Sequence, residues 1–415
     1  MDPLPAAYLN PDGFLHAGRF HRTTTYGHDR ADGPLTVSYA VAGSADPEAP
    51  TLVWQNGMGS HRLAACLLDG LCDTHGVRVV TLDRPSAGKS TQVPLEDRVR
   101  LSHEALLAVL AAENITVFSI LSHSNGIIYA LYTLLNLPDH LTVLSWSLSS
   151  PWVPPFLSGS TLLSIASWIP TPLTSRLGGL VTGLQKVLGP VDAGLGWSSG
   201  VVRGVSEWSS GFVSMGTTRA ETPSPRAADA TPAGAATAAA AAAEPPEPLT
   251  PLKKRDRFRR TNARKPPHKQ LFGGEYLPPG LFDEGIRIAT AEGLDAMGAE
   301  VMMCLRQGAG ANWGWVDADA APDEPKLYER GFERLKTVLA GRGRPLKMSV
   351  WYAEDDGLIP QQGREYLRTL LCRRLELVAD SDWHTVEDAG HDDTLGRTCV
   401  MQPLLEQVVA AHRLD

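Results

Sequence analysis

Residues 115–137 read ITVFSILSHSNGIIYALYTLLNL. All of the first seven except Ser119 are apolar or β-branched, which favours a buried strand, and the last eleven form an apolar, helix-like run. Between the two lies the short polar turn Ser122-His123-Ser124-Asn125-Gly126. A strand that enters a helix through such a tight turn exposes the central side chain at the top of the sheet. The stretch predicts a nucleophile elbow with Ser124 at its centre; the alternative is an ordinary polar loop between a strand and a helix.

Four more polar loops follow short strand-like runs or stand near the C-terminus. They are 55–60 (QNGMGS) after 51–54, 83–90 (DRPSAGKS) after 77–82, 353–360 (AEDDGLIP) after 346–352, and 389–393 (AGHDD). The order serine, acid, histidine, with each motif at a strand end, resembles the serine-nucleophile branch of the α/β-hydrolase superfamily, whose members include esterases and lipases. The resemblance covers residues 35–150 and 345–412, and Ser122 stands where the family's G-x-S-x-G has its first glycine.

The resemblance implies an α/β fold with a mostly parallel central sheet, helices on both faces and a helical cap insertion. The alternation of strand-like and helix-like runs from residue 35 to 150 independently favours a parallel sheet covered by helices. We expect residues 1–151 to form the N-terminal part of the core, 152–345 the cap, and 346–415 the C-terminal part of the core. Further expected elements are strands at 35–42 and 141–148 and helices at 99–112, 286–305 and 326–339.

The expected cap is divided by composition. Residues 156–212 are apolar and contain several tryptophans, whereas 217–270 are Pro-rich, then Ala-rich, then basic. The second stretch lacks the aromatic and β-branched residues that offset ordering entropy, so it is predicted to be disordered. Its segment 253–265 has eight basic residues in thirteen. A solvated linker and a transient contact with anionic lipid, nucleic acid or an import receptor all remain open for it.

A serine hydroxyl attacks a carbonyl efficiently only when a base removes its proton. His391, which follows Gly390, is the candidate base, and His384 is the competitor within a strand-like run. The acid is one of three adjacent carboxylates; the family spacing relative to the following proline implies Asp356, with Asp355 as the alternative. The predicted triad is therefore Ser124, Asp356 and His391.

An oxyanion hole needs two backbone N–H groups, one after the nucleophile and one from the loop after an early strand. The family pattern assigns these to Asn125 and Met58. Asn56 occupies a position where the family often has histidine, but a main-chain donor does not depend on that side chain.

Composition excludes some classes of function. The chain has 415 residues, a formal net charge of −8 and five scattered cysteines without a C-x-x-C motif. We expect no nucleic-acid partner, no cofactor and no metal, since H-E-x-x-H spacing is also absent. No signal-like start and no long apolar run are present, so a cytoplasmic location without a transmembrane segment is expected.

The sequence as a whole favours a serine esterase that cleaves a carboxylic ester of a neutral, apolar small molecule or lipid through an acyl-enzyme. Two alternatives remain open: an acyltransferase with the same triad, and a catalytically silent scaffold with a hydrolase fold. The oligomeric state is not indicated by any pattern in the sequence.

Overall fold

The computed structural model describes residues 10–59, 61–160, 271–272, 275–276, 281–293, 296–307, 313–315, 326–343, 345–387 and 389–414. The predicted disordered stretch 217–270 and most of the tryptophan-containing stretch 156–212 lie outside these residues, so both stay predictions.

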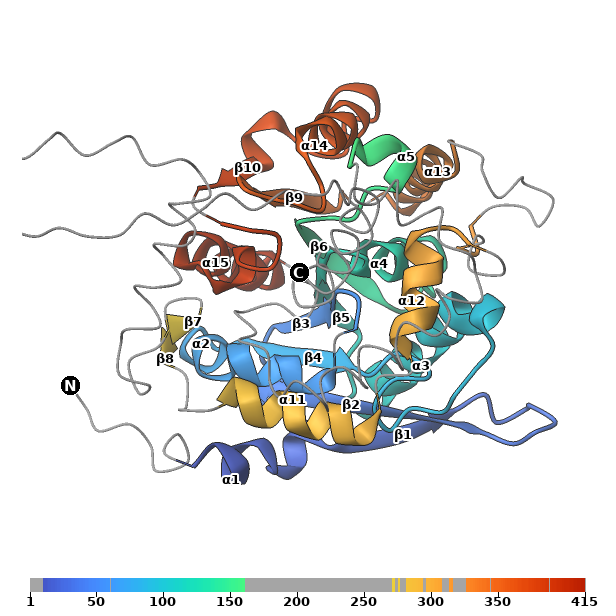
Figure 1. The fold of residues 1–415 in the computed structure, drawn as a ribbon, viewed down its shortest axis with the longest axis vertical. Helices are drawn as coiled ribbons and strands as arrows, with labels where there is room; N and C mark the ends of the chain where they lie inside the picture. Colours follow the sequence, from blue (N-terminus) through green and yellow to red (C-terminus); the bar gives the residue numbers. More distant parts are fainter. Residues whose placement is uncertain are drawn as a thin grey trace, which may run out of the picture.

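An eight-stranded mixed sheet forms the centre of the protein, in the order β1-β2-β4-β3-β5-β6-β9-β10 (Figure 1). The strands are β1 (Arg22–Tyr26), β2 (Leu35–Gly43), β3 (Thr51–Gln55), β4 (Arg78–Leu82), β5 (Val117–His123), β6 (Thr142–Ser149), β9 (Lys347–Ala353) and β10 (Trp383–Val386). The pairs β1–β2 and β2–β4 are antiparallel, and all the other pairs are parallel. The expected mostly parallel sheet is therefore confirmed, with an antiparallel edge at its N-terminal strands.

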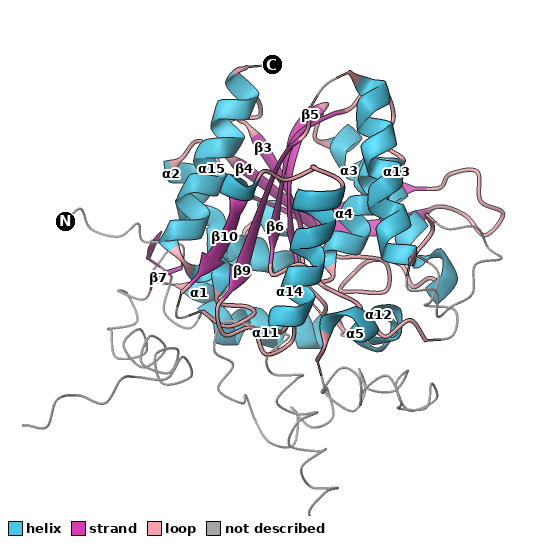
Figure 2. Cartoon of the chain, turned by 90° about the horizontal axis from the view of Figure 1, so that it is seen from above, coloured by secondary structure: helices cyan, strands magenta, loops and turns pink. Residues whose placement is uncertain are grey.

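Helices cover both faces of this sheet. On one face lie α3 (Arg98–Ala112), α4 (Gly126–Leu135) and α13 (Leu327–Arg342); on the other lie α2 (Asp69–Thr74) and α15 (Thr398–Arg413) (Figure 2). Successive residues of a strand point to opposite faces. Accordingly Val53 and Val80 belong to the core on the α3/α4 face, while Leu52 and Val79 belong to the core on the α2/α15 face. Burial on both faces explains why β3 and β4 have adjacent apolar residues at their centres.

Two elements differ from the sequence-based expectation. The single helix expected at 286–305 is two helices, α11 (Leu281–Glu292) and α12 (Ala296–Cys304). Gly293, which follows α11, has a φ of 110°, a conformation outside the helical region that glycine adopts without a Cβ clash. The edge strand β1 was not expected; three of its five residues are threonines and only Tyr26 is buried.

The described helices of segment 152–345 pack against the core. Short helix α5 (Pro155–Ser158), α11 and α12 lie along one end of the sheet (Figure 2), and a two-stranded ribbon is formed by β7 (Leu271–Phe272) and β8 (Glu275–Tyr276). Phe332 of α13 stacks on Trp146 of β6 with ring centroids 6.1 Å apart. Although segment 152–345 separates β6 from β9 in sequence, the two strands pair directly. Among the helices of the described part of the chain, none combines the length and apolarity needed to cross a membrane.

Candidate active site

Ser124 lies at the turn between β5 and α4. Its φ is +51°, in the left-handed region that non-glycine residues rarely adopt and that costs of the order of 1–3 kcal/mol. The turn also requires a glycine two residues later. A Cβ at Gly126 would lie 2.1 Å from the carbonyl oxygen of Gln55 and 2.8 Å from that of Asn56, so only glycine allows α4 to begin this close to β3. These are the features expected of a nucleophile elbow.

The three residues of the predicted triad meet in this structure. The Nε2 atom of His391 is 2.9 Å from the Oγ atom of Ser124, and the Nδ1 atom of His391 is 2.8 Å from Oδ2 and 2.9 Å from Oδ1 of Asp356. Oδ1 of Asp356 also accepts hydrogen bonds from the backbone N–H groups of Leu358 and Ile359, at 3.0 and 2.8 Å. Ser124, Asp356 and His391 are 3%, 5% and 7% exposed. Low exposure strengthens the electrostatic interactions among them.

The alternative candidates for the nucleophile, the base and the acid lie in other surroundings. The Oγ atom of Ser122 accepts a hydrogen bond from the indole N–H of Trp146 at 2.8 Å. His384 stacks on Trp351 with ring centroids 3.9 Å apart. For the acid, the carboxylate within hydrogen-bonding distance of His391 is that of Asp356, not that of Asp355.

The pKa of His391 is raised above its ordinary value of 6.5. Burial is the largest influence and by itself lowers this pKa, but the charge of Asp356 and its hydrogen bond, with further contributions from Asp392 and Asp393, outweigh it. His391 therefore accepts a proton more readily than an isolated imidazole, a property suited to a general base.

The loop that begins at the last residue of β3, residues 55–59, lies against the elbow. A Cβ on Gly57 would be 3.5 Å from Cβ of Ser124. Two carbonyl oxygens of this loop accept hydrogen bonds from the guanidinium of Arg84: that of Asn56 at 2.7 Å and that of Gly57 at 2.6 Å. The amide of Asn56 donates to Thr81 in β4, at 2.8 Å, and thus fixes the start of the loop. The predicted oxyanion donors, the N–H groups of Met58 and Asn125, belong to these two adjoining segments, and their role stays a prediction.

Two buried polar groups near the site were not predicted from the sequence. The Nε2 atom of His123 is 3.1 Å from Oδ1 of Asp392, and its ring centroid is 5.3 Å from that of His391. Glu300 forms ion pairs with Arg84 and Arg98. The second group leaves a signal in the sequence, because Glu300 is the single charged residue of the apolar helix α12. A charge buried in this way normally has a partner.

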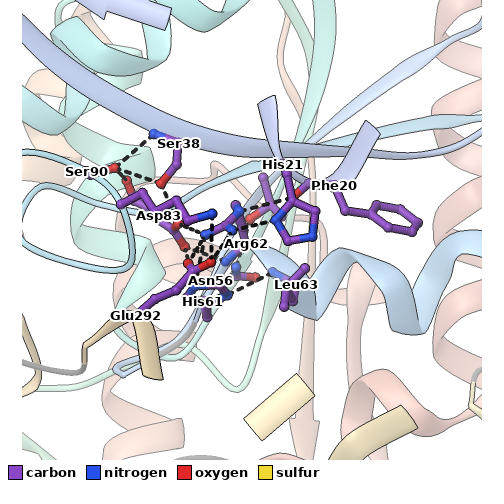
Figure 3. Close-up of polar contacts among 12 residues, drawn as sticks. Phe20, His21, Ser38, Asn56, His61, Arg62, Leu63, Asp83, Ser90 and Glu292 are labelled. Carbon is purple, nitrogen blue, oxygen red and sulfur yellow. Dashed lines mark hydrogen bonds and ion pairs between the residues drawn. The ribbon is translucent and has the colours of Figure 1, made fainter. Parts of the chain in front are cut away.

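Two clusters in the described residues hold enough donor atoms for a metal ion: His123, His391 and Asp392, and His61, Asp83 and Glu292. In the first, both ring nitrogens of His391 already face Ser124 and Asp356. In the second, the guanidinium of Arg62 lies among the donors, 2.6 Å from Asp83 and 2.5 Å from Glu292, so a cation already occupies that position (Figure 3). Neither donor set fits a metal site without rearrangement.

No protein-family model matches the chain, and no curated protein matches it in sequence. Among solved structures it is similar to a "putative lipase" from Acinetobacter baumannii AYE, at 13% identity, covering 100% of this chain and 99% of that one, with a TM-score of 0.51. It is also similar to a thermophilic esterase from Thermogutta terrifontis, at 12% identity, 94% and 99% coverage and a TM-score of 0.47. An epoxide hydrolase from Vigna radiata matches at 11% identity, 95% and 98% coverage and a TM-score of 0.45. Identities this low bear on the fold alone. With the strand order and the elbow, the first likeness places the chain among proteins that have the α/β-hydrolase fold.

Proposed function

We propose that the protein is a serine hydrolase that cleaves a carboxylic ester of a neutral, apolar small molecule or lipid through an acyl-enzyme on Ser124. The observation that carries the proposal is the continuous hydrogen-bonded chain from Ser124 through His391 to Asp356, with Ser124 held at a positive φ. A structural serine gains nothing from this conformation, whereas a nucleophile gains exposure of its hydroxyl to a bound carbonyl.

The first step is attack of the Ser124 oxygen on the ester carbonyl carbon, while the hydroxyl proton passes to Nε2 of His391. Asp356 accepts the hydrogen bond from Nδ1, which keeps the lone pair of the neutral ring on Nε2 and stabilises the imidazolium that forms. The carbonyl oxygen becomes an oxyanion, which the N–H groups of Met58 and Asn125 bind.

Collapse of this tetrahedral intermediate breaks the bond to the alcohol, and the proton on His391 passes to the leaving oxygen. The acyl group remains on Ser124 as an ester. Water then attacks this ester, with His391 accepting one of its protons and returning it to Ser124 as the carboxylic acid departs. An acyltransferase would differ only in replacing water with another acceptor.

The preference for apolar substrates follows from the surroundings of the site. The backbone N–H of Trp152, which is 3% exposed, donates to the Ser124 carbonyl at 3.1 Å. Met297 of α12 packs so closely on Gly59, in the loop that carries Met58, that a Cβ there would be 2.7 Å from its Cε. Two uncharged residues thus adjoin the segments that carry Ser124 and Met58, and we infer from them a preference for an apolar acyl or alcohol group over an ionised one. The formal net charge of −8 further disfavours anionic substrates.

The test is labelling with a fluorophosphonate, which reacts with activated serines. Wild type and Ser122→Ala are expected to incorporate one label per chain, and Ser124→Ala none. Full labelling of Ser124→Ala would contradict the assignment of the nucleophile. A wild-type protein that neither labels nor hydrolyses p-nitrophenyl esters would instead support the silent scaffold.

A further inference from the structure

We propose that Glu300, on α12 of segment 152–345, is a positioning residue that sets the geometry of the oxyanion loop, defined here as residues 55–59. The segment would then be part of the catalytic architecture and not only a cover over the substrate. This inference rests on the proposed function, since it concerns the N–H group of Met58 that would bind the oxyanion.

The contact between Glu300 and the loop is direct. Oε2 of Glu300 accepts a hydrogen bond from the backbone N–H of Gly59 at 2.9 Å. This N–H belongs to the peptide group that follows Met58. Gly59 has a φ of +69°, so the loop bends there and the carboxylate binds the N–H group at the bend.

A second contact reaches the peptide group before Met58. The Nε and Nη2 atoms of Arg84 lie 2.6 and 2.9 Å from the two carboxylate oxygens of Glu300, and Nη2 also donates to the Gly57 carbonyl at 2.6 Å. The Gly57 carbonyl and the Met58 N–H share one planar trans peptide, in which they point in opposite directions. Fixing the carbonyl on Arg84 therefore directs the Met58 N–H to the opposite side. Glu300 thus fixes both peptide groups that flank Met58. It binds the following one directly and the preceding one through Arg84.

The surroundings of Glu300 keep its carboxylate charged. Glu300, Arg84 and Arg98 are 2%, 4% and 1% exposed. Burial alone would raise the pKa of the Glu300 carboxyl, but the charges of Arg84 and Arg98 and the bond from Gly59 hold it below its ordinary value. The ring of Tyr129 lies 4.4 Å from the Arg84 guanidinium carbon and limits its movement. Such rigid support is what a catalytic loop needs, because a displacement of about 1 Å costs roughly 100-fold in rate.

A neighbouring ion pair offers a matched control. Glu292 of α11 also joins segment 152–345 to the core, since its carboxylate oxygens lie 2.5 and 2.8 Å from Nη1 and Nη2 of the fully buried Arg62 (Figure 3). Its other contacts are with His61 and Lys89, both outside residues 55–59. Shortening Glu292 weakens attachment of the segment to the same kind of buried arginine without touching the peptides around Met58.

The experiment compares Glu300→Asp with Glu292→Asp. Both variants keep the charge and lose one methylene, and the shortened carboxylate of Glu300→Asp cannot span Arg84 and the Gly59 N–H together. For this variant we expect kcat on a p-nitrophenyl ester to fall about 10-fold to 100-fold with KM changed less than about threefold, while Glu292→Asp keeps kcat. A second readout is inhibition by an arylboronic acid, whose boron bonds to the Ser124 oxygen as the proton passes to His391. Its tetrahedral adduct places an oxygen in the oxyanion hole, so its Ki should rise in parallel with the loss in kcat.

A merely structural role predicts equal losses of thermal stability in the two variants and no separate change in kcat or in the boronate Ki; that result would overturn the proposal. If Glu300→Asp does not fold, Arg84→Lys tests the same loop from the core side, since lysine keeps the charge but cannot bind two carbonyls and a carboxylate at once. Wild-type kcat for a folded Arg84→Lys would equally contradict the inference. Absence of both labelling and turnover in wild type would instead reject the proposed function itself.

Discussion

Three aspartates, Asp356, Asp392 and Asp393, act on the imidazole of His391 and set the pH at which it can serve as a base. Their charges outweigh the burial that opposes protonation and raise the pKa of His391 above 6.5. Asp356 accepts the hydrogen bond from Nδ1, on the side of the ring opposite to Ser124. Asp392 acts through its charge and also contacts His123, so it tunes the base without belonging to the chain of proton transfer.

We therefore expect kcat/KM for a neutral ester to fall on acidification along a limb whose midpoint lies above pH 6.5, because only neutral His391 accepts the Ser124 proton. In Asp392→Asn the limb should move to lower pH, since a charge that raises the pKa is lost. Asp355→Asn, in the adjacent loop, is the control and should leave the limb in place. A pH series of initial rates on the three proteins measures this, and a limb that Asp355→Asn shifts and Asp392→Asn does not would contradict the electrostatic account.

Loss of activity along this limb is distinct from unfolding through His391. Its pKa is raised in the folded state relative to 6.5, so proton binding favours the folded protein. That stabilisation is fully present below pH 6.5 and is lost as the pH rises through the folded-state pKa. Circular dichroism at each pH separates the two effects.

Some residues of the candidate site could be predicted from sequence patterns, and others could not. Ser124, His391 and Asp356 lie in short local motifs at strand ends, and a parallel sheet brings such ends together, so their meeting could be predicted; the choice of Asp356 over Asp355 rested on the family spacing. The Glu300–Arg84 pair joins residues more than two hundred positions apart, and no local motif records that distance. The pairing of His123 with Asp392 could not be predicted either, because it depends on where the loop after β10 returns.

Helix α4 and strand β3 meet backbone to backbone at the elbow. Gly126, the first residue of α4, faces the carbonyl oxygens of Gln55 and Asn56. Because backbone atoms form both sides of this contact, neither can move aside as a flexible side chain would. The absence of a Cβ at Gly126 thus allows the segment that carries the nucleophile to lie directly against the oxyanion loop.

Gly126→Ala is expected to lower the free energy of unfolding by about 1–3 kcal/mol, as overpacking does in a well-packed core, and to reduce fluorophosphonate labelling. Gly285→Ala is the control: it lies within α11, nothing is within 4 Å of its added Cβ, and alanine favours helix by up to about 1 kcal/mol. Thermal or urea unfolding measures both variants. Equal stability of Gly126→Ala and wild type would show that the contact is looser than its distances indicate.

The spacing of apolar residues was sufficient to predict most core elements. It failed where contacts between distant elements determine the structure. Strands were expected from apolar runs at 51–54, 77–82 and 346–352, and the structure has them at Thr51–Gln55, Arg78–Leu82 and Lys347–Ala353. The runs are apolar because both faces of this sheet are buried. The antiparallel pairing of β2 with β4 could not be predicted, since a strand's sequence does not state its neighbour's direction. The break between α11 and α12 was missed because apolar positions continue past Gly293 and hide the change in backbone direction.

In the described part of segment 152–345, the helices α11, α12 and α13 are each attached to the core by side chains. Helix α11 is bound by Arg62 through Glu292, α12 by Arg84 and Arg98 through Glu300, and α13 by the stacking of Phe332 on Trp146. All three attachments lie C-terminal to residue 280 in the segment. The stretch 217–270 lies outside the described residues, and its composition argues against a packed core.

Replacement of residues 217–270 by a short Gly/Ser bridge should accordingly leave the melting temperature nearly unchanged. Long insertions cost little closure entropy, about 0.6 kcal/mol per doubling of length, so shortening one gains or loses little. Because the deletion leaves in place the packing of Met297 on Gly59 and the hydrogen bond of Trp152 to Ser124, the deleted protein should keep the preference of the full chain for apolar esters. The measurement is a series of p-nitrophenyl esters of rising acyl length on both proteins, alongside thermal unfolding. We expect rates that rise beyond acetate to a maximum at a longer chain in both; a fastest rate on acetate with steady decline would contradict the apolar site. Unfolding of the deleted protein would instead show that 217–270 supports the attachments of α11, α12 and α13, which makes the two failures distinguishable in one experiment.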